Sequence, residues 1–185
     1  MFVHLISSKK FHNNFLYAIE IQTVVGPMIA VADEQDLCLL SFLDAKNVAD
    51  EVQRLCRMRS SNITLGYTEP IVSIQQELKE YFQHGLADFK TPISLFDSLF
   101  YQTVWQALQV IPFGQTCSYK QIAQAIKHPS AFRAVARANA ANRYAILIPC
   151  HRVINADGAL GGYSGGIERK KWLLYHEEQL AIHIK

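Results

Sequence analysis

The sequence predicts an α+β protein in two parts, a strand-rich first half and a mostly helical second half. Residues 15–43 hold three short runs rich in β-branched and aromatic side chains, whereas residues 98–180 show mainly helical spacing of apolar residues. With 185 residues, of which 50% are hydrophobic, the chain can form one large domain or two small ones. The charge balance shifts around residues 88–97 and Pro92 interrupts the pattern there, so we expect domains at residues 1–95 and 96–185.

The first half is predicted to be an antiparallel meander followed by helices. The expected strands are Phe15–Val24, Met28–Ala32 and Leu37–Leu43, with Gly26-Pro27 joining the first two. Helical spacing follows over Ala45–Met58 and Ile71–His84, and Gly85 occupies the position of a C-cap.

The second half is predicted to consist of short helices. The expected helices are Ser98–Val110, Tyr119 to about Ile126, Ser130 to about Asn139, and Glu168–Leu180. Ser118 and Gln121 form a capping box, and Ser130 is the expected N-cap of the next helix. Two short helices joined by a His128-Pro129 turn make residues 118–140 a helix-turn-helix candidate.

Charge is divided unevenly between the halves. Residues 1–97 carry 8 Lys/Arg and 12 Asp/Glu, whereas residues 98–185 carry 10 and 4, and no acidic residue occurs from Ser98 to Ala156. A one-signed basic segment suits a polyanion such as DNA, because phosphate contacts release condensed counterions. A solvated basic face is the alternative. Arg133 and Arg137 share one face of an alanine-rich helix, which favours close approach to a groove.

Cys150 is the leading candidate for chemistry. It lies in Pro149-Cys150-His151-Arg152-Val153, and neighbouring cationic side chains are expected to lower the pKa of a thiol toward the nucleophilic thiolate. The preceding residues 145–148 are expected to form a short buried strand that Pro149 ends. A structural core cysteine is the alternative interpretation.

Composition excludes several other classes of protein. The four cysteines, Cys38, Cys56, Cys117 and Cys150, form no Cys-x-x-Cys pair, so we expect free thiols in a reducing cytoplasm and neither a metal nor a cofactor. No apolar run is long enough to span a bilayer, and the first residues lack the order of a signal peptide.

Residues 98–180 closely resemble the O6-alkylguanine-DNA alkyltransferases, also called methylated-DNA–protein-cysteine methyltransferases. Three segments carry the resemblance: Arg133-Ala134-Val135, residues 148–154 around Cys150, and Gly162-Tyr163-Ser164-Gly165-Gly166. The first half has the length and element order of that family's ribonuclease-H-like N-terminal domain. The resemblance implies repair by irreversible, single-turnover transfer of an alkyl group from guanine O6, and also from thymine O4, in double-stranded DNA. It implies a monomer.

The resemblance also implies roles for individual residues. The sulfur of Cys150 attacks the alkyl carbon, His151 takes the thiol proton through a water, and Glu177 holds the imidazole in the required tautomer. Tyr119 donates to the developing guanine anion, and Asn142 braces the active-site turn. This is the nucleophile, base and orienter arrangement of hydrolytic triads.

The implied substrate pocket holds an extruded base. Its expected members are the backbone N–H of Ser164, Lys170, Tyr163 and the carbonyl groups of Cys150 and Val153. For DNA binding, the resemblance assigns Arg133 as the finger that fills the vacated stack. Tyr119, Ala134 and Arg137 are expected to face DNA in the minor groove, whose pattern gives little sequence readout.

Two positions depart from the family pattern, and three other functions remain open. Ala136 replaces a common glycine, and Arg143 replaces a common proline and becomes a candidate for a phosphate contact. The alternatives are a non-catalytic alkylated-DNA-binding protein, a methylation-responsive regulator and a Cys-His hydrolase. Cys150 argues against the first, the lack of a zinc cysteine cluster against the second, and the acid-free basic stretch against the third.

Overall fold

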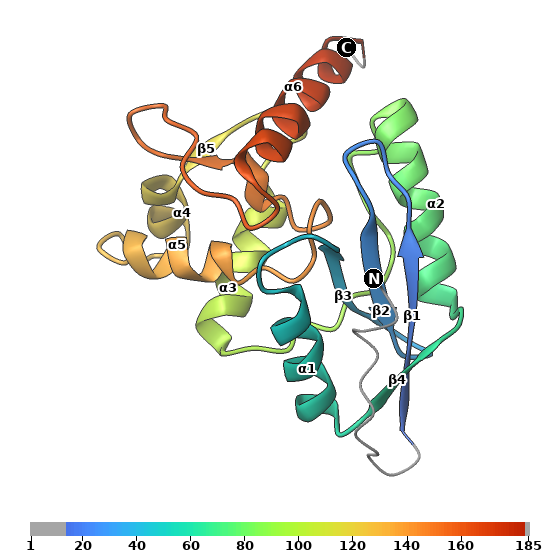
Figure 1. Ribbon diagram of the computed structural model, residues 1–185. Coiled ribbons are helices and arrows are strands. Elements are labelled where there is room, and N and C mark those ends of the chain that lie inside the picture. Colours follow the sequence, from blue (N-terminus) through green and yellow to red (C-terminus); the bar gives the residue numbers. More distant parts are fainter. Residues whose placement is uncertain (1–13, 184–185) are drawn as a thin grey trace. The chain divides into compact units, whose positions relative to one another are not determined.

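The computed structural model describes residues 14–183 and divides between Ser94 and Leu95 into two compact units. The prediction about a signal peptide concerns residues outside the described ones. The first unit contains β1 (Phe15–Ile21), β2 (Met28–Ala32), β3 (Leu37–Phe42), α1 (Val48–Arg59), β4 (Asn62–Leu65) and α2 (Glu69–His84). The second contains α3 (Leu99–Gln109), β5 (Cys117–Ser118), α4 (Tyr119–Ala125), α5 (Phe132–Ala140), the 3-10 turn η2 (Cys150–Arg152), β6 (Val153–Ile154) and α6 (Ile167–His183). The predicted α+β class is confirmed (Figure 1).

The sheet of the first unit has the strand order β3-β2-β1-β4. Its first three strands form the expected antiparallel meander, whereas β4 pairs in parallel with β1. The strand β4 was not predicted from the sequence. That strand has four residues, only Ile63 of which is buried, so it carries almost no hydrophobic signal.

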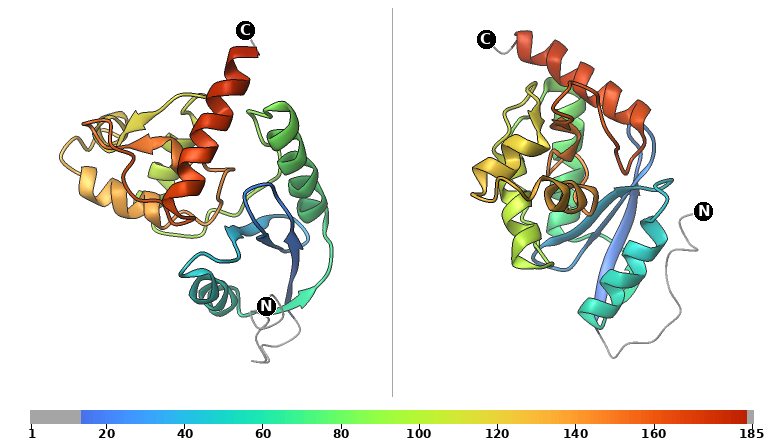
Figure 2. Two further views of the ribbon diagram at one scale, coloured as in Figure 1. Left: turned by 45° about the horizontal axis from the view of Figure 1, so that its top comes forward. Right: turned by 90° about the vertical axis from the view of Figure 1, so that its left-hand side faces the viewer.

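A helix covers each face of this sheet, so the unit has three layers (Figure 2, left). Successive side chains of β1 point to opposite faces of the sheet, and residues on both faces are buried. Each face therefore needs a helix to cover it. Leu16 and Ala18 join the core cluster that α1 completes through Val52 and Leu55. The other helix, α2, contacts β1 and β2, and Gly85 caps it at φ 73° as predicted.

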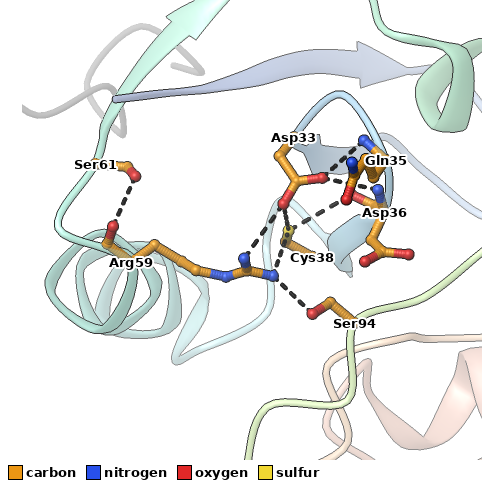
Figure 3. A network of polar contacts seen from close by, with 7 residues as sticks. All are labelled: Asp33, Gln35, Asp36, Cys38, Arg59, Ser61 and Ser94. Atoms are coloured by element: carbon orange, nitrogen blue, oxygen red, sulfur yellow. Dashed lines mark hydrogen bonds and ion pairs between the residues drawn. The ribbon is translucent and has the colours of Figure 1, made fainter. Parts of the chain in front are cut away.

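Arg59, at the end of α1, ties together three separate segments of the first unit (Figure 3). Its guanidinium pairs with Asp33 Oδ2 at 3.3 Å and donates to Ser94 Oγ at 2.6 Å. It also approaches the buried Cys38 Sγ at 3.6 Å. The arginine therefore holds α1, the turn before β3 and the end of the unit in one polar network.

The second unit is built around α3 and the helix-turn-helix. Trp105 of α3 is fully buried, and its indole N–H donates to the carbonyl of Ala138 in α5 at 2.8 Å. Ser118 and Gln121 form both hydrogen bonds of the capping box that begins α4, as expected. The described helices of both units include none long and apolar enough to cross a membrane.

Two local predictions in this unit were wrong. Ser130 is not the N-cap of α5, because the turn continues one residue further and the helix begins after Ala131, whose N–H donates to His128. Residues 145–148 are buried but form a turn, not a strand. Ile146 adopts φ 73°, and the N–H of Ile148 donates back to the carbonyl of Tyr144 at 2.9 Å. A short apolar run without alternating polar residues does not distinguish a buried strand from a buried turn.

Candidate active site

Cys150 begins η2, and Asn142 fixes the turn that leads into it. The Nδ2 of Asn142 donates to the carbonyl of Ile148 at 2.8 Å and lies 3.0 Å from Cys150 Sγ. Its Oδ1 accepts from the N–H of Tyr144 at 2.9 Å. One amide thus closes the turn at both ends and also touches the sulfur, which is the bracing position that the resemblance implies.

The thiol of Cys150 is buried, with 2% of the residue exposed. Burial raises its pKa to about 11, although the hydrogen bond from Asn142 and the charge of Lys170 act in the opposite direction. The expectation that adjacent His151 and Arg152 lower this pKa was wrong. Both of those side chains are directed to Glu177 instead, so a proton acceptor is needed to form the thiolate.

His151 and Glu177 form a fully buried pair, with Nε2 and Oε1 2.8 Å apart. Burial opposes ionisation of Glu177, but hydrogen bonds from His151 and Arg152 and the charge of Arg152 outweigh it and hold the pKa of the carboxyl well below its usual range. Burial lowers the pKa of His151, so the ring is neutral near pH 7. An ionised carboxylate only accepts, so Nε2 carries the hydrogen and Nδ1 is the basic nitrogen.

Arg152 anchors the carboxylate of Glu177 from the other side. Its Nε donates to Oε2 at 2.8 Å and its Nη2 to Oε1 at 3.0 Å. Its Nη1 donates to the carbonyl of Ile111 at 2.6 Å, and the guanidinium lies over the ring of Phe113 at 5.6 Å. These contacts hold the carboxylate of Glu177 in place, so Arg152 acts as its brace.

The loop after α3 completes the surroundings of Glu177. The N–H of Gly114 donates to Oε2 at 3.2 Å. Gly114 has φ 74°, and a Cβ there would meet the Cβ of Ala181 at 2.7 Å, so a glycine is required for this approach to α6.

A cavity of about 290 Å³ opens onto Cys150. It is lined by Tyr119, Ala136, Asn139, Ala140, Cys150, Gly162, Tyr163 and Ser164. The structure therefore brings together four of the residues predicted from the sequence, namely Tyr119, Cys150, Tyr163 and Ser164. The volume of the cavity is close to the lower limit for pockets that bind small ligands.

A small sheet links the segment of Tyr119 to the segment of Cys150. The two-residue strands β5 and β6 pair in parallel, with Cys117 opposite Val153. Tyr119 directly follows β5, and the Cys150 turn directly precedes β6. Because the strands are parallel, these residues lie beyond opposite ends of the small sheet, and both line the cavity. Burial, with a contribution from Cys150, raises the pKa of the Tyr119 hydroxyl, which therefore remains a donor at neutral pH.

Lys170 is fully buried but does not line the cavity. Its ammonium donates to the carbonyls of Val153, at 2.6 Å, and of Leu160 and Gly162. Burial lowers its pKa. The contacts with Leu160 and Gly162 hold the loop that contributes Gly162 to the cavity wall. The contact with Val153 uses the carbonyl that was expected to face the substrate.

Three of the four predicted DNA-contacting residues, Arg133, Ala134 and Arg137, lie on α5, whereas Tyr119 begins α4. Arg133 and Arg137 are exposed and Ala134 is half-buried, whereas Val135 and Ala138 are buried. The two arginines do not reach the cavity, which Ala136 and Asn139 of the same helix line. The helix thus presents its basic side chains to solvent and its small side chains to the pocket.

Arg143 does not act as a phosphate contact in this structure. It is 4% exposed and donates to Asp97 Oδ2 at 2.9 Å and to the carbonyl of Phe96 at 2.6 Å. Sequence reasoning missed this ion pair because the two residues lie 46 positions apart. Asn139 was also not predicted as a site residue, because the sequence placed it only at the end of a predicted helix. Residues 14–183 contain no group of three or more His, Cys, Asp or Glu side chains that could hold a metal ion.

Family models match both units. The ribonuclease-like domain of 6-O-methylguanine DNA methyltransferase matches residues 16–95, and the DNA-binding domain of the same family matches residues 99–179. The methylated-DNA–protein-cysteine methyltransferase of Salmonella typhimurium is 37% identical over 168 residues, which cover 88% of this chain and 96% of that protein. The protein of that name from Methanosarcina barkeri is 36% identical over 162 residues, or 85% of this chain and 94% of its own length.

Solved structures give the same result. The O6-methylguanine methyltransferase of Mycobacterium tuberculosis superposes with a TM-score of 0.76 at 35% identity, over 89% of this chain and 93% of that one. A structure of the Mycobacterium tuberculosis protein in complex with DNA superposes with a TM-score of 0.74 at 35% identity, over 90% and 94%. Family models match both halves of the chain, and the sequence identity to relatives extends over nearly its whole length. The chain therefore belongs to the methylated-DNA–protein-cysteine methyltransferase family.

Proposed function

We propose that this protein repairs DNA by moving an alkyl group from O6 of guanine to the sulfur of its own Cys150. The observation that carries the proposal is a buried cysteine that opens onto a cavity beside Tyr119 and adjoins a His151–Glu177 pair. Relatives of the same family are named for transfer to a protein cysteine, and one has been solved in complex with DNA.

The proposed reaction is a single displacement. The sulfur of Cys150 forms a bond to the alkyl carbon while the bond between that carbon and O6 breaks, and the electron pair passes to the guanine ring. The thiol proton passes to Nδ1 of His151, which has no hydrogen-bond partner among the described residues. The resemblance implies that a water carries it there.

Tyr119 is proposed to complete the step by donating to the guanine anion as charge develops. The backbone N–H of Ser164 is proposed to contact O6, since Ser164 lines the same cavity. His151 is held for its role by Glu177, which Arg152 fixes in turn. The thioether that forms has no route back to the thiol in this scheme, so each molecule acts once.

The proposed substrate is double-stranded DNA with the damaged nucleotide extruded into the cavity. Arg133 would fill the vacated stack, while Ala134 and Arg137 of α5 would face the minor groove. Alkyl groups on O4 of thymine are proposed as further substrates. We also propose that the protein acts as a monomer in the cytoplasm, where its free thiols stay reduced.

The direct test uses a duplex containing one O6-methylguanine. Incubation should add one methyl group to the tryptic peptide that contains Cys150, detected by its mass. Cys150→Ala should bind the same duplex and gain no methyl group. A folded wild-type protein that binds the duplex without forming the adduct would support the non-catalytic alternative instead.

A further inference from the structure

Phe132 is an exposed aromatic residue on the helix that is proposed to face the minor groove. It begins α5, and 44% of the residue is exposed. The exposed positions of this helix are Phe132, Arg133, Arg137 and Ala140, so Phe132 is the one large apolar side chain among them. Side chains of a helix tilt toward its N-terminus, so the ring of this first residue extends beyond the end of its own helix.

Phe132 shares one stripe of α5 with the residues that line the cavity. Ala136, Asn139 and Ala140 follow it by four, seven and eight positions, which is the spacing of a single helix face. All three line the cavity that opens onto Cys150. With a rise of about 1.5 Å per residue, Phe132 lies about 6 Å along the helix axis from Ala136. It therefore lies one turn beyond the cavity wall, on the side of the helix that faces the cavity.

The ring of Phe132 also lies beside the side chain that is proposed to enter the base stack. The centre of the ring is 5.6 Å from the guanidinium carbon of Arg133. Successive bases of one strand are about 3.4 Å apart along the duplex axis, so this separation is less than two base steps. When Arg133 occupies the position of the extruded base, a ring that keeps this separation reaches the adjacent base step.

The charge around Phe132 favours DNA as the partner of this ring. No acidic residue occurs from Ser98 to Ala156, and the neighbouring exposed positions include Arg133 and Arg137. An apolar protein surface would leave these cations without counter-charge, whereas DNA offers phosphates outside the groove and apolar base faces within the stack. Proteins that bind the minor groove frequently insert apolar side chains, phenylalanine among them, between base steps.

We propose that Phe132 inserts as an apolar wedge at the base step next to the extruded nucleotide and stabilises the opened duplex together with Arg133. The inference rests on the proposed function and adds a second DNA-distorting residue to it. The wedge carries no charge, so its contribution to affinity is independent of counterion release. It has no hydrogen-bond donor or acceptor, so it reads no base edge and adds no sequence preference.

The first measurement is the affinity for a duplex that contains one O6-methylguanine. All proteins carry Cys150→Ala, so binding is measured without transfer. Phe132→Ala should weaken binding by about 5- to 30-fold, as expected for the loss of one aromatic contact with a base. The slope of log affinity against log salt should stay unchanged. Phe132→Leu keeps an apolar wedge and should retain most of the affinity. Tyr175→Ala, at an exposed aromatic residue of α6, is the matched control and should change the affinity by less than about 2-fold.

The second measurement reports on the base step itself. The fluorescent base 2-aminopurine, which becomes brighter when it unstacks, is placed two positions from the lesion, on either side in separate duplexes. Binding should raise its fluorescence on one side. The rise should be lost in Phe132→Ala and kept in Phe132→Leu, whereas a ring that only packs within the protein would not affect this signal. Phe132→Gln also removes the apolar wedge and replaces alanine if circular dichroism shows that Phe132→Ala is not folded.

The outcomes separate the inference from the proposed function. The inference requires weaker binding and a lost 2-aminopurine signal in Phe132→Ala, with both recovered in Phe132→Leu, and any other pattern overturns it. Equal losses in the alanine and leucine variants would show that the ring only holds Arg133 through its cation–π contact. Absence of methyl transfer by the protein with Cys150 intact would instead overturn the proposed function itself.

Discussion

The thiol of Cys150 is strongly buried, and the next residue in the chain, His151, carries a basic nitrogen. Its pKa of about 11 leaves very little thiolate at neutral pH. Burial alone would make the residue inert, and the neutral imidazole of His151 is the group that can change this. The proposed chemistry therefore depends on proton transfer to His151 and not on a thiolate that exists beforehand.

The transfer rate should depend on pH through His151. Protonated imidazole cannot accept the thiol proton, and burial lowers the pKa of this ring below its ordinary value of 6.5. We therefore expect the single-turnover rate to be constant just above pH 6.5 and to fall only at more acidic pH. A rate that already declines between pH 8 and 7 would contradict this account of the base.

Substitution of His151 tests the same step at neutral pH. His151→Gln removes the base and should lower the transfer rate by about 10²- to 10⁴-fold. Binding to the methylated duplex should remain near that of the wild type, because the side chain is fully buried. Transfer at an unchanged rate in a folded variant would assign the proton to another group.

Arg152 should contribute mainly to stability. Arg152→Met leaves Glu177 buried without its bidentate partner, and breaking a buried ion pair costs about 3–5 kcal/mol. We expect the free energy of unfolding in urea to fall by about that amount. Arg137→Met, at an exposed arginine of the same unit, is the control and should change it by less than about 0.5 kcal/mol. Equal effects of both changes would argue against the brace.

At the scale of elements, α5 has two different sides. Its buried positions pack on α3 through the bond between Trp105 and Ala138, while Arg133 and Arg137 are exposed. These arginines belong to a stretch without acidic residues, so their charge is not neutralised by neighbours in sequence. A surface of this kind binds phosphates in a salt-dependent manner.

Arg137→Ala should weaken duplex binding equally for methylated and unmodified DNA. Loss of one phosphate contact should reduce the slope of log affinity against log salt by about 1. Lys79→Ala, an exposed change in α2, is the matched control and should alter neither quantity. An unchanged salt slope in Arg137→Ala, measured by fluorescence anisotropy, would exclude this residue from the DNA contact.

The end of α1 should depend on Arg59. Arg59→Met removes the ion pair with Asp33 and the bond to Ser94, which are partly exposed, so we expect a loss of about 1–2 kcal/mol in unfolding free energy. Arg57→Met lies on the same helix at an exposed position and should have little effect. Urea unfolding compares the two variants, and indistinguishable midpoints would show that the network adds no stability.

Elements with strong periodicity or capping signals were predictable from the sequence, whereas those held by distant contacts were not. The meander, the Gly85 cap and the Ser118 capping box agree with prediction because each depends on local residues. The strand β4 and the turn at residues 145–148 were missed or wrong because a parallel partner and the Asn142 amide determine them. The same limit hid the pair of Arg143 with Asp97.

At the scale of the whole molecule, the candidate chemistry and the net positive charge both belong to the second unit. This unit holds Cys150, the cavity and the acid-free stretch, and its family model is named for DNA binding. The sequence identified Cys150 and its neighbours because the motif is local. The pKa of Cys150 and the unpaired oxygen of Asn139 could not be predicted, since both result from how the fold buries them.

The stoichiometry of transfer tests the central claim most directly. The protein is incubated with an excess of duplex that carries a radiolabelled methyl group on guanine O6, and label bound to protein is counted over time. If Cys150 is an irreversible acceptor, the label reaches one methyl group per protein molecule and stays there, and Cys150→Ala takes up none. Continued loss of methyl groups from DNA beyond that ratio, or labelling of the alanine variant, would contradict the account.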